Sequence, residues 1–538
     1  MAEPSPRGED DADLQQVDKS ISDVSANDGQ IKSGPLAGRS LMAAILIVGL
    51  PVLFQNLMAA CVGLVDKMLV GGLDADTVVP AMDGLGIGSY VGWLMGIAMS
   101  GLGIGGQAII ARAIGRGDVR EGEYALAQAM VLSVVWGILV GAIVWMLAPM
   151  LATVCGLSGE AGTYCTNYVR VVILSLPLIG VMMVGAMCMA GSGETLRPAL
   201  IAVAVNIVNI VCSWWLSGAV FRLGDLHIES ALQYDMNVMG IAAGTALGYL
   251  AGGVLTILVL VRGVKDLRLR VALLGPLRSM IARIIKIGIP NFFEGISMWG
   301  ANILVLMMIG WVALKDSGAG GDSAITLGEA GIGPDHMGTE SMLVTEVTGG
   351  IAADVPAVAE GLAGAHIIAV QWESFSFLPG FAIGTAAAAL AGQYLGAGNT
   401  HMARRAVWIC TGLGVVLMGL VGVVYAIWGR GLTAIVSDEP LFLEIVPQLL
   451  LICGVTQVFF AISMVVRQAL RGVGDTTWTF LITTGSSYGI RLPAAWYFGV
   501  VLDMGLPGIW IGLCGELSLR AVFFLARFMY GGWATKAI

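Results

Sequence analysis

The sequence ARAIGRGD at residues 111–118 ends one long apolar segment, and GQYLGAGN at residues 392–399 ends another. Aligning the two places Gly115 opposite Gly396, an offset of 281 residues. The same offset places Gly193 of GSGETLRP (191–198) opposite Gly474 of RGVGDTTW (471–478), and Thr195 opposite Thr476. The chain therefore contains an internal repeat, in which two halves hold the same order of apolar segments.

The composition places both halves in a membrane. Of the 538 residues, 57% are hydrophobic and only 12% are charged, about half of the ~25% charge that a soluble domain carries. The formal net charge of -9 argues against a nucleic acid partner, because binding phosphates needs a basic face. We expect a polytopic protein whose immediate surroundings are the lipid bilayer.

Twelve apolar segments are long enough to cross a hydrocarbon core of about 30 Å. The predicted spans are 42–71, 80–112, 121–150, 161–192, 196–219, 238–262, 284–312, 362–393, 403–430, 440–471, 477–500 and 506–530. Connections after even-numbered spans carry most of the arginines and lysines. The positive-inside rule therefore predicts that both termini face the cytoplasm.

The predicted fold class is an all-α membrane protein with twelve transmembrane helices in two six-helix repeat lobes. Two repeats that start on the same side are related by an axis along the membrane normal, which predicts a cavity between the lobes and alternating access. The expected parts are a disordered cytoplasmic tail (1–40), a first lobe (41–263), a cytoplasmic linker (264–283), the helix 284–312, an acidic outward-facing insertion (313–361), and the rest of the second lobe (362–538).

This chain resembles the multidrug and toxic compound extrusion (MATE) family of cation-coupled exporters. GLPVLFQNLMAACVGLVDKMLVGGL at 49–73 looks like the family's first helix, and RLP at 491–493 and GLPGIWIG at 505–512 fit its last two. The resemblance covers residues 41–535. It implies a V-shaped pair of six-helix lobes and the export of organic, cationic compounds across the cytoplasmic membrane by proton or sodium antiport.

Asp66 falls inside the first span, where a charge costs at least about 2.5 kcal/mol. The repeat places the apolar Val305 opposite it, so the acid is unique to the first half. Because a low-dielectric cavity disfavours the charged form, this carboxyl can carry a proton or bind sodium through its oxygens. The resemblance implies that Asp66 is the family's cation-linked aspartate. The alternative is an acid that reaches water beside Lys67.

The fifth span supplies possible companions, Asn206, Asn209 and Ser213. Residues 209 and 213 are one turn apart and share a helix face. An asparagine carbonyl could bind a cation, and the amide could hydrogen-bond a protonated Asp66. The alternative role for both asparagines is hydrogen bonding between helices.

The first-lobe site departs from the family's fullest cation site in two ways. Ser213 stands where many relatives have Asp or Asn, and Gly248 falls where the sixth helix often has a threonine, with Thr245 about a turn away. The alternative is that Asp66 and Asn209 bind a sodium ion. These departures favour protons as the coupling ion.

The second half has its own acids inside predicted spans. Glu294 follows Pro290 by one turn and is a candidate for a second coupling or substrate site. Glu373 is another candidate, and its alternative role is a buried ion pair with Arg491. Glu516 and Arg520 are four residues apart, a spacing that predicts a local ion pair.

Candidates for the wall of the substrate cavity are polar or aromatic. Gln55 is the residue opposite Glu294 in the repeat. Trp93, Trp299 and Trp372 could hold an aromatic cation by cation-π contact, although packing against lipid is the alternative.

Enzymes and pumps that hydrolyse ATP have no support, because neither HExxH nor GxxxxGK[ST] occurs. We therefore expect no enzyme activity, no cofactor and no metal beyond the coupling ion, and a monomer that binds a small organic cation. The rival class is a flippase for lipid-linked oligosaccharides or lipids. An anionic lipid carrier would need a basic central cavity, whereas the expected intramembrane cations are few: Lys67, Arg170, Arg467, Arg491 and Arg520.

Overall fold

The computed structural model describes residues 31, 33–316 and 357–536, apart from 71, 74, 155, 156, 158, 224, 225, 229–233, 235 and 438. The described chain is almost entirely helical, as predicted. Its one sheet is a short antiparallel hairpin of β1 (Phe221–Leu223) and β2 (Leu226–Ile228), which the all-α prediction did not anticipate. The hairpin lies in a connection between two spans. Outside the hydrocarbon core, water can bind backbone N–H and C=O groups, so the chain there need not be helical.

The helices of the first half follow the predicted spans closely. They are α2 (Leu41–Val70), α3 (Ala75–Arg116), α4 (Val119–Val154), α5 (Gly159–Ile173), α6 (Leu176–Gly191), α7 (Leu196–Ser217) and α8 (Asn237–Arg262). Helices α5 and α6 are one predicted span, bent by 57° at the break before Pro177. Proline has no backbone N–H and its ring displaces the preceding turn, so the bend falls at this residue.

The second half begins after a 3₁₀ turn, η1 (Val271–Leu273), in the linker. Its helices are α9 (Arg278–Asp316), α11 (Ala357–Gly396), α12 (Thr400–Val436), α13 (Pro440–Gly472), α14 (Thr476–Ser486), α15 (Leu492–Trp496) and α16 (Gly505–Tyr530). Two π-helical turns, η2 (Ser487–Arg491) and η3 (Tyr497–Val501), join α14 and α15 into one run around Pro493. Ten spans of the described chain are single apolar helices; the bent pair and this run complete the predicted twelve.

The two lobes are repeats related by a twofold axis parallel to the helices. Helix α2 packs on α11 of the other lobe, and α9 packs on α3, so the same contact occurs twice with the lobes exchanged. A Cβ atom at Gly115 would overlap the carbonyl oxygen of Gln393, and one at Gly396 would overlap that of Arg112. Both pairs of positions differ by the 281 residues of the sequence repeat. The predicted symmetry is therefore confirmed at the crossing of α3 and α11.

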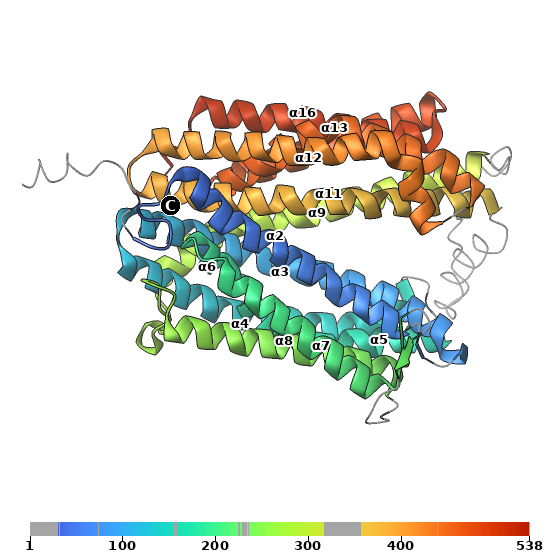
Figure 1. Cartoon of the computed structure of the whole chain (residues 1–538), viewed down its shortest axis with the longest axis horizontal. Helices are drawn as coiled ribbons and strands as arrows, with labels where there is room; N and C mark the ends of the chain where they lie inside the picture. Colours follow the sequence, from blue (N-terminus) through green and yellow to red (C-terminus); the bar gives the residue numbers. More distant parts are fainter. Residues whose placement is uncertain are drawn as a thin grey trace, which may run out of the picture.

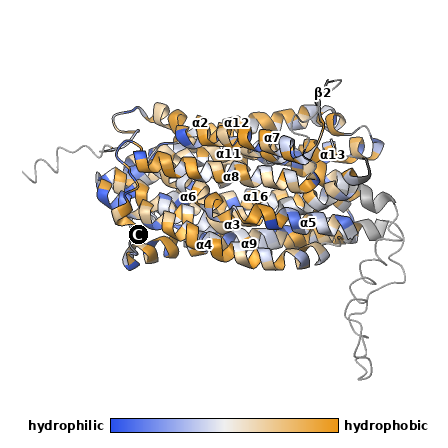
Figure 2. Ribbon diagram, turned by 90° about the horizontal axis from the view of Figure 1, so that it is seen from below, coloured by the Kyte–Doolittle hydropathy of each residue, from blue (hydrophilic) through white to orange (hydrophobic). Residues whose placement is uncertain are grey.

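The lobes meet at one end of the molecule, which we call the basic end. It holds the α3/α4, α6/α7, α8/α9, α11/α12 and α13/α14 connections, and Figure 1 shows the C-terminus there. From this end α2 and α7 slant away from α11 and α12, which gives the V shape (Figure 1). Figure 2 shows hydrophobic residues along the helices and hydrophilic ones gathered at the basic end.

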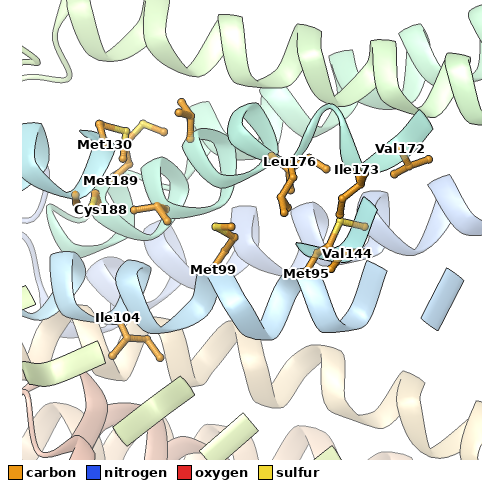
Figure 3. Packing of buried hydrophobic residues seen from close by; sticks show 14 of the residues in the cluster. Met95, Met99, Ile104, Met130, Val144, Val172, Ile173, Leu176, Cys188 and Met189 are labelled. Atoms are coloured by element: carbon orange, nitrogen blue, oxygen red, sulfur yellow. The ribbon is translucent and has the colours of Figure 1, made fainter. Parts of the chain in front are cut away.

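The first lobe has a core rich in sulfur-bearing side chains. Met95 and Met99 of α3 lie close to Leu176 of α6 and Val144 of α4 in Figure 3. Methionine side chains are flexible and fill irregular gaps between bent helices. The outer helix faces are also apolar, since large hydrophobic residues such as Ile427 are exposed. An apolar outside is what a lipid environment requires.

Part of the expected tail is ordered against the basic end, which corrects the predicted boundary at residue 40. Ser33 Oγ donates to the carbonyl oxygen of Ile114 at 2.8 Å, the Gly34 N–H donates to Asp266 Oδ2 at 2.8 Å, and Leu36 is buried. The reason is that Leu36 is an apolar anchor within a polar segment. Residues 1–30, and the insertion predicted at 313–361 apart from its helical margins, lie outside the described residues.

Candidate functional site

Asp66 lies in the half of α2 that is distant from the basic end and is buried, with 2% of its surface exposed. Three neutral side chains from three other helices donate hydrogen bonds to its carboxylate. They are Tyr168 of α5 at 3.3 Å, Asn209 of α7 at 3.2 Å and Thr245 of α8 at 2.9 Å. Lys67 is exposed and points elsewhere, so the expected alternative of an acid reaching water beside Lys67 is wrong.

Thr245 supplies the hydroxyl that the sequence reading took to be missing from the sixth span. That expectation is wrong because glycines bring α8 unusually close to α7. A Cβ atom at Gly244 would overlap Ser213, and one at Gly248 would lie 3.0 Å from the carbonyl oxygen of Val205. This close approach lets Thr245 reach both Asp66 and Asn209, whose Nδ2 donates to its hydroxyl at 2.9 Å.

The other two predicted companions have different positions. Ser213 accepts a hydrogen bond from Asn209 at 3.3 Å and donates to the carbonyl oxygen of Ile241, so it supports Asn209 and is not bonded to Asp66. Asn206 is not at the carboxylate. Its amide donates to the carbonyl oxygen of Met58 at 2.9 Å, which ties α7 to α2. The predicted role of an asparagine in joining helices therefore fits Asn206, and the predicted companion of Asp66 is Asn209.

The Asp66 site has no counter-charge among the described residues. Its partners are two hydroxyls and one amide, and none of the ion pairs in the described chain includes it. The amide nitrogen of Asn209 faces the carboxylate, while its Oδ1 is buried and has no partner within the described part of the chain. Burying an unpaired carboxylate is costly. A proton or a bound cation would remove that cost.

Two adjoining cavities lie inside the molecule. One of about 90 Å³ is walled by the first lobe, including Asn206 and Tyr249. The other, of about 180 Å³, lies between the lobes and is lined by polar groups from both, such as Gln107 of α3 and Arg471 of α13. Gln55 of α2 lines both cavities, as its predicted role requires.

Two of the three predicted tryptophan candidates, Trp299 and Trp372, line neither cavity. Trp299 lies on the outer side of α9, 39% exposed, which is a lipid-facing position. Trp372 packs against Phe375 on α11, with ring centres 5.8 Å apart. The side chain of Trp93 lies outside the described residues. Neither Glu373 nor Arg491 lines either of these two cavities.

Two buried acids of the second lobe, Glu294 and Glu516, are paired with arginines. Glu294 lies 2.8 Å from Arg471 Nη2, and the i, i+4 pair Glu516 and Arg520, at 2.7 Å, is confirmed. Arg491 also binds Glu516, at 3.0 Å, and the ion pairs of the described chain include none between Arg491 and Glu373, the alternative role considered for that acid. The π-helical turn η2 carries Arg491 toward α16, where Glu516 lies.

Sequence reasoning missed Tyr168 and Arg471. Tyr168 follows an interfacial segment and has no periodic signal that separates it from a core residue. Arg471 was missed because it is the last residue of its predicted span. Its spacing of four residues from Arg467, which places both on one face of α13, is the signal that could have identified it.

Two lobes of six spans around buried cavities, with a buried acid in one lobe, define a multi-pass membrane transporter. The model of the MatE family matches residues 51–215 and 357–497, more than half of the chain. The chain belongs to this family.

Similar proteins carry names of the same kind. The "Probable multidrug resistance protein NorM" of Thermotoga maritima is 25% identical over 504 residues, which span 92% of this chain and 93% of that protein. The "Multidrug export protein MepA" of Staphylococcus aureus is 24% identical over 255 residues, spanning 47% of this chain and 53% of that protein.

Solved structures share the fold at low identity. One described as the outward-facing conformation of a multidrug resistance MATE family transporter has a TM-score of 0.75 and 18% identity, covering 93% of this chain and 98% of that chain. Another, described as a MOP superfamily transporter from Pyrococcus furiosus with reverse polarity of the binding pocket, has the same values.

Proposed function

We propose that this protein exports organic cationic compounds in exchange for protons, with Asp66 as the coupling group. The observation that carries the proposal is the burial of Asp66 among three neutral donors with no counter-charge in the described residues. A carboxylate in this setting is close in energy to its protonated form. Movement of the protein that changes its contact with water then takes up or releases a proton.

Protonation would change the packing of α2. The ionised carboxylate holds Asn209 of α7 and Thr245 of α8 by hydrogen bonds that gain strength from its charge. When a proton arrives from outside, these bonds weaken and α2 can shift against α7 and α8. The first-lobe cavity lies between these helices, so the shift narrows it and expels the cargo. Return to the inward state releases the proton.

Two features support protons over sodium as the coupling ion. Asn209 presents its amide nitrogen to the carboxylate, an arrangement that stabilises an anion; a sodium ion would need the amide oxygen turned inward. Ser213 also brings no second carboxylate to the site. Sodium at Asp66 and Asn209 is the competing assignment.

We place the protein in the cytoplasmic membrane, with the basic end and both termini in the cytoplasm. This orientation is supported by the positive-inside rule. The exposed basic residues of the basic end include Arg116, Arg120, Lys265, Arg268, Arg270, Arg278, Arg404 and Arg405. Because the lobes meet there, the conformation described is closed to the cytoplasm, the state in which protons would enter and cargo would leave.

The proposed cargo is a small organic cation carried by a monomer. The first-lobe cavity has an apolar wall that includes Met182, Met183 and Met189 beside Tyr249. Methionines adapt to varied shapes, and an aromatic face attracts cations. Names such as "multidrug resistance protein" for similar proteins agree with a broad choice of cargo.

The test is transport in proteoliposomes with proton and sodium gradients imposed separately. An organic cation such as ethidium is expected to move against its own gradient when the proton gradient alone is imposed. Transport driven by sodium alone would reject proton coupling. Loss of ethidium transport under both gradients, in protein that still binds ethidium, would reject export.

The flippase alternative is favoured by one observation: Arg471 lines the cavity between the lobes. A fluorescent lipid-linked pyrophosphate in the same vesicles provides the comparison. Translocation of that lipid without ethidium export would assign the protein to the flippase class.

A further inference from the structure

A cluster of charged side chains lies beside the inter-lobe cavity, apart from the Asp66 site. Glu294 of α9 is fully buried between Arg467 and Arg471, which are one turn apart on α13. The Arg471 Nη2 lies 2.8 Å from Glu294 Oε2, and the Arg467 Nη1 lies 3.6 Å from Oε1. Thr479 and Thr483 of α14 donate to the same carboxylate, at 3.3 and 2.7 Å.

This cluster has more positive charge and more donors than its acid can satisfy. One carboxylate faces two guanidinium groups, each with five N–H donors. The Nε atoms of Arg467 and Arg471 are both buried and have no partner in the described chain. Arg467 is only 8% exposed, and apart from Glu294 its contact is with the sulfur of Met298 at 3.6 Å. The cluster therefore lacks an acceptor.

The second buried cluster of the same lobe provides a contrast. Glu516 also lies between two arginines, Arg491 and Arg520, at 3.0 and 2.7 Å. In this cluster, however, the arginine N–H donors that do not bind Glu516 have other partners. Arg491 donates to Asn302, and Arg520 donates to Ser486 and Ser487. The unmet donors are therefore specific to the cluster at Glu294.

One member of this cluster, Arg471, reaches the cavity. Arg471 lines the space between the lobes, together with the amide side chains of Gln468, Gln55, Asn56 and Gln107. Gln468 accepts a hydrogen bond from Arg471 Nη1 at 3.1 Å, which holds the guanidinium in place. A planar guanidinium with neighbouring amides is well suited to bind a carboxylate.

We propose that the inter-lobe cavity binds the carboxylate of an amphipathic substrate through Arg471, with Arg467 supplying the uncompensated charge behind it. This inference rests on the proposed export of cations and narrows the substrate class to zwitterions, which carry a cationic amine and a carboxylate. An acidic group would supply the missing acceptor and balance the second guanidinium.

The test uses a pair of ligands that differ only in the carboxylate. Dansyl-lysine is a zwitterion and its methyl ester is a cation; binding of each is measured by fluorescence to the full-length protein in phosphatidylcholine nanodiscs. The wild-type protein is expected to bind the zwitterion at least about 10-fold more tightly than the ester.

Two substitutions change the cluster in opposite directions. Arg471→Gln should bring the affinity ratio of zwitterion to ester close to one and leave binding of the ester within about 2-fold. Glu294→Gln, which leaves both arginines charged, should raise that ratio. Arg405→Gln removes the same charge from the exposed surface of α12 and should leave the ratio unchanged. Ester binding shows that each variant is folded, and the Glu294→Gln result stands by itself if Arg471→Gln does not fold.

The inference is overturned if Arg471→Gln keeps the wild-type ratio, or if Glu294→Gln lowers it. It is also overturned if replacing phosphatidylcholine by phosphatidylglycerol abolishes the preference, because the arginines would then serve a lipid headgroup. Efflux of the ester driven by a proton gradient is measured in parallel. Failure of that efflux with an intact affinity ratio rejects the proposed export and leaves the carboxylate site standing.

Discussion

The Thr245 hydroxyl donates a 2.9 Å hydrogen bond to Asp66 Oδ2, which joins the sixth span of the first lobe to its first. Thr245 also accepts from Asn209, and Tyr168 of α5 donates to the same carboxylate, so four helices meet there. A change in the charge of Asp66 therefore alters the hydrogen bonds that join α2 to α7 and α8. These are the helices that wall the first-lobe cavity.

Thr245→Val tests this contact, because it removes the donor and keeps the shape. A hydrogen bond to a charged group contributes about 1.5–3 kcal/mol, and 1.36 kcal/mol corresponds to one pH unit. Loss of the donor destabilises the ionised carboxylate, so the proton is held to higher pH. The pH of half-maximal transport in proteoliposomes should rise by roughly 1–2 units.

Thr256→Val is the matched control for that measurement. Thr256 is buried in the same helix, but its hydroxyl donates to the carbonyl oxygen of Gly252 within α8. Its pH profile should match that of the wild type. A downward shift in Thr245→Val, or an equal shift in both variants, would contradict the role of Thr245.

Closure of the basic end depends on the glycines where α3 crosses α11. In Gly115→Ala the added methyl group would overlap the backbone of Gln393, which cannot move aside as a side chain does. Overpacking of this kind costs about 1–3 kcal/mol, and 1.4 kcal/mol is a factor of ten in a population. Spin labels at positions 120 and 405, exposed on the two lobes, should report longer distances.

Gly141→Ala is the control for Gly115→Ala. A Cβ atom at Gly141 would make ordinary contacts of 3.5 Å or more within the first lobe. Distances between the labels should then stay at their wild-type values. Unchanged distances in Gly115→Ala as well would show that the crossing does not hold the lobes together.

The Glu516 cluster is expected to matter for stability. Glu516→Gln leaves Arg491 and Arg520 without their shared acid in a buried site. Breaking a buried pair by removing one partner costs about 3–5 kcal/mol. Thermal unfolding in detergent should show a fall of several degrees in Tm, while Glu439→Gln, at an exposed position, should change it little. An unchanged Tm in Glu516→Gln would show that the arginines find other partners.

The segment between α9 and α11 is expected to be dispensable for transport. Replacing residues 317–356 with a short Gly/Ser linker changes only the closure entropy of a connection, which depends weakly on length. Ethidium efflux should stay within a few-fold of the wild-type rate. Loss of efflux from protein that still binds ethidium would assign the segment an active role.

The fold could be predicted almost completely from the sequence, because its signals are long and repeated. Twelve apolar segments of the required length and a constant offset between paired glycines specify the spans and their symmetry. The bend before Pro177 was also foreseeable. The order of residues 33–40 was not, since it rests on the single anchor Leu36 and on contacts with residues far along the chain.

The site could be predicted only in part. Asp66 and Asn209 stand out because polar residues are costly inside a membrane. Thr245 could not be placed, since its reach depends on how closely Gly244 and Gly248 let α8 approach α7. The pairing of Arg491 with Glu516 was equally hidden, because it depends on a π-helical turn that has no sequence signature of its own.

Asp66→Asn tests the central claim most directly, with internal pH recorded as ethidium is added to proteoliposomes under a proton gradient. Asparagine keeps the size of the side chain and one acceptor oxygen but cannot titrate. The variant is expected to bind ethidium yet to show neither gradient-driven efflux nor ethidium-dependent proton movement. Asp118→Asn, at an exposed position in the α3/α4 turn, should behave like the wild type. Efflux by Asp66→Asn at the wild-type rate and with the wild-type pH dependence would contradict the account.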